Sequence, residues 1–260
     1  MIDPPAVLPP PLRGVRAAFV SLTRLPLGGF PYCAADFSWA LAHAPLVGAV
    51  VGALTAAVFR VLAPAGEGAA ALLAVGFSML VTGAFHEDGL ADTCDALGGG
   101  HDRDRVFVIL KDSRIGAFGA SALVVSIGTR ALLVARLGAH APWALVATGA
   151  LARVGPVLLA ASLPYVTPAS VSKSRELARV SARQAAVAVA WGAAIVVLSV
   201  CAGATTVPRA GALAAALAFV TALTGIVYFH RAGGVTGDFL GATEQLGELV
   251  ALVVLAWGAA

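Results

Sequence analysis

Three aspartates recur at helical spacing in the segment that begins at His86. Asp88, Asp92 and Asp95 are four and three residues apart, so on a helix their side chains share one face. Carboxylates crowded on one face repel each other unless a cation lies between them. Hard oxygen ligands suit Mg²⁺, which takes one or two carboxylates and completes its shell with water and substrate phosphates. The spacing therefore predicts a Mg²⁺ site, with the neighbouring Glu87 as a further candidate ligand.

Candidate groups for phosphate chemistry surround this stripe. Lys111 and Arg114 can hold phosphate oxygens, Arg through a bidentate fork and Lys as a point charge. Asp112 either joins the metal shell or pairs with a neighbouring base. His86 either orients a phosphate, acts in proton transfer or makes a structural hydrogen bond. Asp88, Asp92, Lys111, Asp112 and Arg114 are therefore predicted to be catalytic, and His86 is predicted to bind substrate.

A second polar motif runs from His230 to Glu244 and is rich in glycine. Glycines there permit tight turns and a close approach of the backbone to a ligand. Asp238 is its natural candidate for a ligand or an acid-base group and is predicted to be catalytic, and Gly237 and Arg231 are predicted to contact substrate.

Ionisable residues also occur inside apolar stretches, where they are expensive and by default indicate function. Arg130, Arg153 and Glu244 are such residues. Arg153 is predicted to face a cavity and bind substrate, although a structural partner such as Glu244 would also explain it.

The elements that position these groups are expected to be membrane helices. Hydrophobic residues make up 59% of the 260 residues and charged residues 12%, whereas a soluble domain carries about 25% charged residues. Most of the apolar stretches approach the roughly 20 residues that cross a bilayer as a helix. We expect an all-α, polytopic membrane bundle of about seven transmembrane helices in one domain spanning 1–260. The stretches are 39–62, 69–85, 116–136, 142–162, 185–204, 210–229 and 241–259.

Basic residues predict the orientation of this bundle. Twelve of the 17 Lys and Arg residues fall in 1–38, 86–115, 163–184 and 230–240. The positive-inside rule places those segments in the cytoplasm and gives an N-in, C-out topology. The cytoplasmic N-terminal segment 1–38, the acidic catalytic loop 86–115 and the second motif loop 230–240 then share one side. The loop 163–184 is expected to be solvated, with a contact to an anionic substrate as the alternative.

Other partners are disfavoured by the sequence. The net charge of +3 comes without a stripe of basic residues interleaved with aromatics, so no nucleic acid is expected. Cys33, Cys94 and Cys201 lie far apart and predict neither a disulfide framework nor a zinc site.

Taken together, the ordered motifs resemble the cobalamin synthase family, the adenosylcobinamide-GDP ribazoletransferases. The resemblance extends from about residue 20 to about residue 250. It is carried by Thr23-Arg24-Leu25-Pro26, Pro45-Leu46-Val47-Gly48, Phe85-His86-Glu87-Asp88-Gly89-Leu90-Ala91-Asp92, Asp95, Lys111-Asp112-Ser113-Arg114-Ile115-Gly116, Gly119 and Gly233-Gly234-Val235-Thr236-Gly237-Asp238.

The resemblance implies a late step of coenzyme B12 assembly in the bacterial cytoplasmic (inner) membrane, with the active site facing the cytoplasm. The family joins α-ribazole, or its 5′-phosphate, to adenosylcobinamide-GDP and releases GMP in a Mg²⁺-dependent reaction. It also marks Arg24, within its first motif, as a candidate substrate contact. A homo-oligomer is left open.

Two other functions compete with this interpretation. CDP-alcohol phosphatidyltransferases use a related run of spaced aspartates, but they place Arg after the Ala where Asp92 follows Ala91 here. A transporter could use the intramembrane Arg130, Arg153 and Glu244, although no inverted repeat with interrupted helices is evident.

Overall fold

The computed structural model describes residues 9–28, 34–166 and 180–258, and in that part of the chain the regular elements are all helices. An isolated bridge between Tyr165 and Val235 is the one β-type pairing described there. The prediction of an all-α bundle is therefore confirmed. The α-helices are α1 (Pro10–Leu22), α2 (Ala34–Ala40), α3 (Ala44–Leu62), α4 (Glu67–Thr82), α5 (Phe85–Gly99), α6 (Arg103–Ile109), α7 (Ala117–Leu137), α8 (Ala141–Leu151), α9 (Val154–Ser162), α11 (Ala182–Cys201), α12 (Val207–Ala232) and α13 (Gly237–Ala256).

Several of these helices suit a membrane. Five helical stretches are long and apolar enough to cross one, and the bent pair of α4 and α5 would make six. The stretch Ala117–Ser162 has 46 residues and covers two predicted spans, 116–136 and 142–162, apart from Gly116. As helix it would extend about 69 Å, roughly twice the bilayer core, which favours two passes. The chain is thus a multi-pass membrane protein by its helices, and the count of about seven spans stays a prediction.

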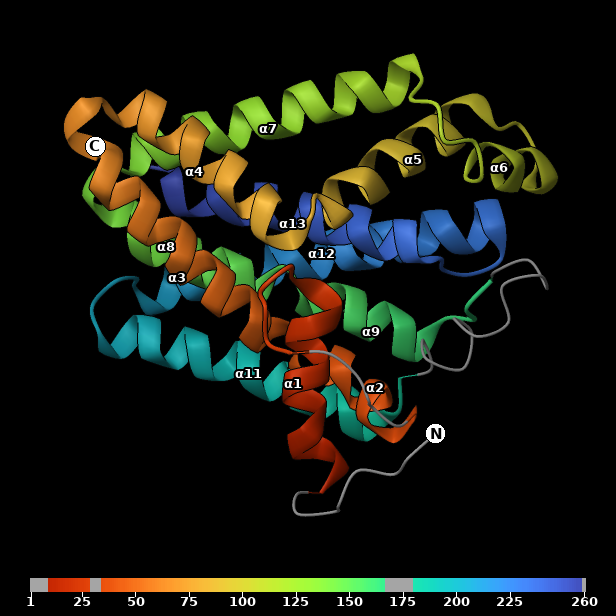
Figure 1. The fold of residues 1–260 in the computed structure, drawn as a ribbon, viewed down its shortest axis with the longest axis horizontal. Coiled ribbons are helices and arrows are strands. Elements are labelled where there is room, and N and C mark those ends of the chain that lie inside the picture. Colours follow the sequence, from red (N-terminus) through yellow and green to blue (C-terminus); the bar gives the residue numbers. More distant parts are fainter. Residues whose placement is uncertain (1–8, 29–33, 167–179, 259–260) are drawn as a thin grey trace.

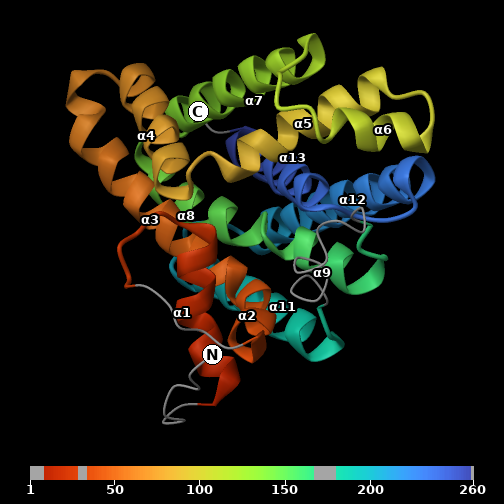
Figure 2. The same cartoon turned by 45° about the vertical axis from the view of Figure 1, so that its right-hand side comes forward.

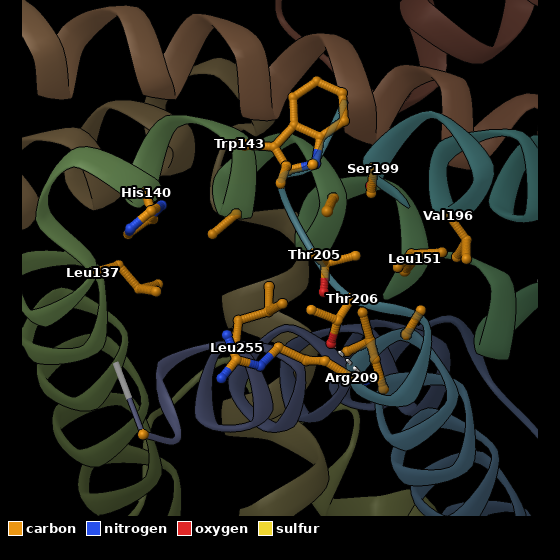
Figure 3. A pocket seen from close by; sticks show the side chains of 17 residues that line it. Leu137, His140, Trp143, Leu151, Val196, Ser199, Thr205, Thr206, Arg209 and Leu255 are labelled. Atoms are coloured by element: carbon orange, nitrogen blue, oxygen red, sulfur yellow. Dashed lines mark hydrogen bonds between the residues drawn. The ribbon is translucent and has the colours of Figure 1, made fainter. Parts of the chain in front are cut away.

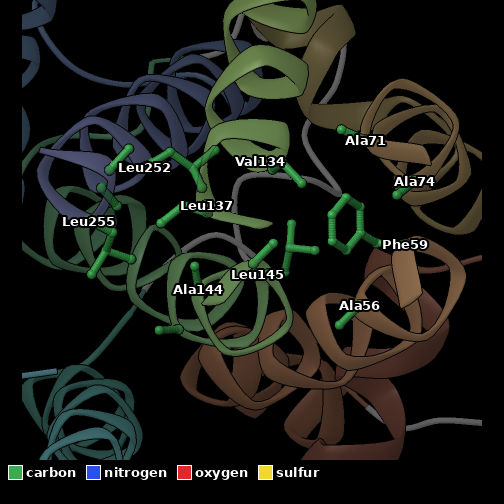
Figure 4. Close-up of a cluster of buried hydrophobic side chains, with 14 of the residues drawn as sticks. Ala56, Phe59, Ala71, Ala74, Val134, Leu137, Ala144, Leu145, Leu252 and Leu255 are labelled. Carbon is green, nitrogen blue, oxygen red and sulfur yellow. The ribbon is translucent and has the colours of Figure 1, made fainter. Parts of the chain in front are cut away.

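The helices form a bundle with the α3–α4 hairpin on one side (Figures 1 and 2). At one end of the bundle, α3, α4, α7, α8 and α13 share a cluster of small and branched side chains (Figure 4). Phe59 is its largest member and is 2% exposed, and alanines such as Ala70 and Ala141 are fully buried. Small residues of this kind let helix backbones approach closely, which is the usual basis of packing in lipid.

The closest of these approaches joins α3 to α8. A Cβ added at Gly48 would collide with the carbonyl oxygen of Gly149, and one at Gly52 would collide with the carbonyl oxygen of Leu145. The two helices therefore meet backbone to backbone, and only glycine leaves room at these positions.

We expect Gly48→Val to destabilise the bundle by about 3 kcal/mol or more. The added side chain would collide with the backbone of α8 at Gly149, and backbone atoms cannot move aside as a side chain can. The measurement is the yield and unfolding temperature of detergent-extracted protein. Gly76→Val is the matched control, since a Cβ at Gly76 meets nothing within 4 Å. Equal yields of the two variants would contradict the packing argument.

The predicted span 142–162 is broken in two between α8 and α9. Pro156 has no N–H for the carbonyl of Ala152, so the helix cannot continue its hydrogen bonds through this point. The break places Arg153 between two helices in the middle of the bundle, where it is 4% exposed.

Candidate active site

The acidic motif begins at a sharp bend in the chain. α4 and α5 meet at 93° across Gly83 and Ala84, both of which have left-handed backbone angles. A left-handed alanine is strained, so the surrounding structure must hold it. Arg24 lies at this bend: its backbone N–H donates to the carbonyl of Val81 over 2.7 Å, and its guanidinium covers Gly83. Arg24 thus supports the start of α5, and its predicted contact with substrate stays a prediction.

The two polar motifs of the sequence meet where α5 crosses α13. A Cβ at Gly89 would lie 2.8 Å from the carbonyl oxygen of Asp238 and 3.3 Å from the Cα of Gly241. The absence of a side chain at Gly89 therefore lets the two helices touch. This contact brings the segment that begins at His86 against the segment that begins at Gly237.

Three carboxylates gather at this crossing, and we call Asp88, Asp92 and Asp238 the carboxylate cluster. Asp88 is exposed and the other two are partly buried, so the cluster is open to solvent on one side. Asp92 lies on α5, which is not one of the five helical stretches that are long and apolar enough to cross a membrane. Partial burial, followed by repulsion from Asp88, Asp238 and Asp95, raises the pKa of Asp92 to about 6. The negative charges of the carboxylate cluster are therefore not balanced by nearby positive charge in the part of the chain that the structure describes.

A divalent cation would supply that charge. Among the described residues, no three His, Cys, Asp or Glu side chains are arranged to hold a metal ion by themselves. Mg²⁺ does not need such a cage, because it is commonly held by one or two carboxylates together with water and substrate phosphates. The chemistry of the carboxylate cluster fits that mode of binding.

Asp95, the third member of the predicted metal stripe, has a different set of partners. Its two carboxylate oxygens accept hydrogen bonds from the backbone N–H groups of Gly116, over 2.7 Å, and Gly119, over 2.9 Å. It therefore caps the N-terminus of α7 from α5. The stripe is helical as predicted, but its last residue joins two helices.

We expect Asp95→Ala to lower stability by about 1–2 kcal/mol, since it leaves two N–H groups of α7 without their acceptor. The Mg²⁺ concentration needed for half-maximal activity should change little. Unfolding in detergent and a Mg²⁺ titration measure the two effects, with the exposed Asp104→Ala as control. A large shift in the Mg²⁺ requirement alone would instead make Asp95 a ligand.

Glu87 points away from the aspartates into a set of buried charges. Arg130 bridges it to Glu248, with Nη2 donating to Oε1 of Glu87 over 2.9 Å and Nη1 to Oε2 of Glu248 over 2.8 Å. Arg153 pairs in turn with Glu244, over 2.9 Å between Nη1 and Oε1. We call this set the buried ion network; its members are Glu87, Arg130, Arg153, Glu244 and Glu248. Glu87, a predicted metal ligand, is thus already paired with the guanidinium of Arg130.

His86 and Arg153 also face an apolar cavity of about 520 Å³, which we call the crossing cavity. Its walls come from α1, α2, α3, α9 and α13, and from the start of α5. Gly237, another predicted substrate contact, lies on its wall. The structure therefore brings three predicted substrate-binding residues to one cavity beside the carboxylate cluster.

Parts of this cavity could not be found in the sequence. Phe37, Leu41 and Ala44 line it, but they lie in or next to the apolar stretch at 39–62 and carry no chemical signal. Their role depends on how α1 and α2 fold back against α3, which periodicity does not show.

The predicted phosphate-binding groups lie in the exposed loop between α6 and α7. Asp112 accepts two hydrogen bonds from the guanidinium of Arg114, at 2.9 Å from Nε and 2.6 Å from Nη2. These bonds lower the pKa of Asp112 to about 2. Asp112 therefore pairs with a neighbouring base, which is one of its two predicted roles. Lys111 is exposed beside them.

Arg231 contacts the C-terminal end of α5, the helix that carries the aspartates. Its Nη2 donates to the carbonyl oxygens of Leu97, over 3.1 Å, and of Gly100. These are carbonyls that the end of α5 leaves without helical partners. The predicted substrate contact of Arg231 stays untested, while its support of α5 is visible.

A second cavity, of about 420 Å³, lies near the opposite end of α13 (Figure 3). Trp143 and Arg209 line it on opposite sides, and Arg209 donates to the carbonyl of Trp257 over 3.0 Å. α13 has 20 residues, so its two ends are about 30 Å apart. This cavity is therefore remote from the carboxylate cluster.

Part of the basic loop 163–184 cannot be compared with the prediction. Lys173, Arg175 and Arg179 lie outside the described residues, as does Cys33.

Comparisons with known proteins identify the family. The family model described as cobalamin-5-phosphate synthase matches residues 14–256. The chain belongs to that family. An adenosylcobinamide-GDP ribazoletransferase of Leptothrix cholodnii is 40% identical over 256 residues, covering 92% of this chain and 94% of its relative. Another, of Bradyrhizobium diazoefficiens, is 38% identical and covers 93% and 92%. A third, of Albidiferax ferrireducens, is 38% identical and covers 82% and 83%.

No solved structure matches this chain. The relatives confirm the family that the motifs resemble, and membership of the cobalamin-5-phosphate synthase family makes the chain an enzyme, a transferase of cobalamin biosynthesis. They do not favour a CDP-alcohol phosphatidyltransferase or a transporter.

Proposed function

We propose that the chain transfers the adenosylcobinamide phosphate moiety of adenosylcobinamide-GDP to α-ribazole, or to its 5′-phosphate, and releases GMP. The carboxylate cluster carries this proposal, because carboxylates from two distant motifs meet at one open site. The names of the relatives supply the donor nucleotide and the ribazole acceptor.

The reaction makes one bond and breaks one. A free ribose hydroxyl oxygen of the acceptor attacks the phosphorus nearer the cobinamide, and the bond from that phosphorus to the bridging oxygen breaks. The bridging oxygen leaves with GMP, and the hydroxyl proton passes to a base. Such transfers depend on positioning and on neutralising charge more than on covalent help from the protein.

We assign Asp88 and Asp92 as the residues that hold Mg²⁺. When bound, the ion would neutralise the pyrophosphate oxygens of the donor. The raised pKa of Asp92 supports this assignment, since its carboxylate lies among other negative charges that the ion would offset. We assign Glu87 to the buried ion network and Asp95 to the cap of α7 instead.

Asp238 is the better candidate for the proton acceptor. A general base works best when its pKa lies near the operating pH. The pairing of Asp112 with Arg114 holds the pKa of that carboxyl at about 2, so it is a weak base. Asp112 instead orients Arg114, and Arg114 and Lys111 would stabilise charge on the phosphates.

We further propose that the chain lies in the bacterial cytoplasmic membrane with its N-terminus inside. The excess of Lys and Arg in 1–38, 86–115, 163–184 and 230–240 supports this orientation. The active site would then face the cytoplasm, where nucleotide substrates are available.

The purified protein in detergent should release GMP only when donor, acceptor and Mg²⁺ are all present. No ion gradient exists in micelles, so turnover there also excludes a transporter. CDP-diacylglycerol offered in place of the donor should give no product. Release of CMP from that substrate, or no dependence on the acceptor, would overturn the proposed function.

A further inference from the structure

The crossing cavity opens beside the reacting groups. Gly237 lies on its wall and is followed directly by Asp238 of the carboxylate cluster. His86 lies in the cavity two residues before Asp88. Residues on the cavity wall are therefore one and two positions along the chain from members of the carboxylate cluster.

The walls of the crossing cavity are mainly carbon. They include aromatic side chains at Phe37 and Phe85 and aliphatic ones at Leu41, Val157 and Leu240. Pockets with apolar and aromatic walls and a few polar groups are typical sites for flat ring systems.

The ring of His86 lies at the polar end of the cavity, beside Arg153 and Glu244. Arg153 and Glu244 are already paired with each other over 2.9 Å. The Nδ1 of His86 is 3.8 Å from Glu244, beyond hydrogen-bond distance, and the described part of the chain gives the ring no hydrogen bond. The side chain of His86 is 8% exposed. A neutral imidazole there can donate one N–H to a ligand.

These features discriminate among the parts of the substrates. A corrin macrocycle with its amide side chains is too large and too polar for 520 Å³ of mostly apolar space. Guanine presents several donors and acceptors on one edge, and most of them would be left unpaired. A bicyclic aromatic base with a single unsubstituted ring nitrogen needs only one donor.

We propose that the crossing cavity binds the aromatic base of the acceptor nucleoside, with His86 donating to its free ring nitrogen. This inference rests on the proposed function and names the substrate part that the cavity selects. The ribose then extends past Gly237, so that a free ribose hydroxyl faces the carboxylate cluster.

Acceptors that differ only in the size of the base test this assignment. In the Ala44→Val variant, two methyl groups are added to the cavity wall at a residue that is 5% exposed. The KM for α-ribazole, whose base is dimethylbenzimidazole, should rise about tenfold, because apolar pockets discriminate to that degree for one or two methyl groups. The KM for the riboside of unsubstituted benzimidazole should change less than about threefold. The KM for the donor should stay at its wild-type value.

Ala53→Val is the matched control, since Ala53 is exposed on the same helix. If Ala44→Val does not fold, Leu41→Ala removes contacts and should weaken acceptor binding alone. His86→Phe should weaken binding of α-ribazole, measured by calorimetry without the donor, and His86→Gln should restore part of it.

The outcomes separate the inference from the proposed function. Wild-type turnover with equal effects of Ala44→Val on both acceptors would overturn the base site and leave the transferase activity standing. A shift in the KM of the donor alone would assign the cavity to adenosylcobinamide-GDP and also overturn the inference. Failure of the wild-type protein to turn over any of these substrates would overturn the proposed function itself.

Discussion

Replacing Asp92 by Asn should lower the rate of GMP release by about a hundredfold or more while the protein stays folded. Asn is nearly isosteric with Asp, but it removes one of the charges that would hold Mg²⁺ at the carboxylate cluster. The measurement is turnover in detergent at saturating substrates over a range of Mg²⁺ concentrations. Asp104→Asn, an exposed change on α6, is the control.

The same variant should be more stable than the wild type in metal-free buffer. The pKa of Asp92 is raised from 3.8 to about 6, so the folded state disfavours its charged form. Its contribution to stability therefore falls as the pH rises through that window and stays lower at pH 8. Asp92→Asn avoids this penalty, so its unfolding temperature at pH 8 should exceed that of the wild type. At about pH 4 the difference should shrink.

Mg²⁺ should reverse that order. An ion that binds the folded state stabilises it, and the wild type has the stronger site. Full activity of Asp92→Asn, or an equal thermal shift on adding Mg²⁺ to both proteins, would refute the assignment of Asp92.

The helix that carries the aspartates could be predicted from the sequence, whereas the different roles of the aspartates along it could not. A spacing of four and three residues indicates one helical face, and α5 does contain Asp88, Asp92 and Asp95. Their separate roles depend on what lies opposite each residue. Gly116 and Gly119 approach Asp95 from α7, and Asp238 approaches Asp92 from α13. Those contacts join residues far apart in sequence, so local spacing could not predict them.

The pairing of charges inside the bundle was partly predictable. Arg153 and Glu244 are both too polar for an apolar stretch, which makes each a natural partner for the other. The bridge from Arg130 to Glu87 was not foreseen, because Glu87 sits among residues that suit a metal site. The 93° bend at Gly83 and Ala84 turns α5 so that Glu87 enters the bundle. A left-handed alanine has no reliable signal in sequence.

The second large effect is expected at Arg130, on α7. Its side chain is 3% exposed and is the cation that lies between Glu87 and Glu248. Arg130→Met would leave both carboxylates without that partner, and removing one member of a buried ion pair costs about 3–5 kcal/mol. The expected result is a large loss of stability in denaturant unfolding in micelles. Arg136→Met, an exposed change on the same helix, should cost far less.

A double variant separates the pair from its surroundings. Glu87→Gln combined with Arg130→Met removes one uncompensated charge together with the cation, so it should be more stable than Arg130→Met alone. The difference gives the coupling energy between the two side chains. Glu87→Gln by itself should lower stability and leave the Mg²⁺ requirement unchanged, because its carboxylate faces Arg130 rather than the carboxylate cluster. A Glu87→Gln enzyme that unfolds like the wild type but needs much more Mg²⁺ would return Glu87 to the metal site. The ion pair would then be incidental to how α5 is held.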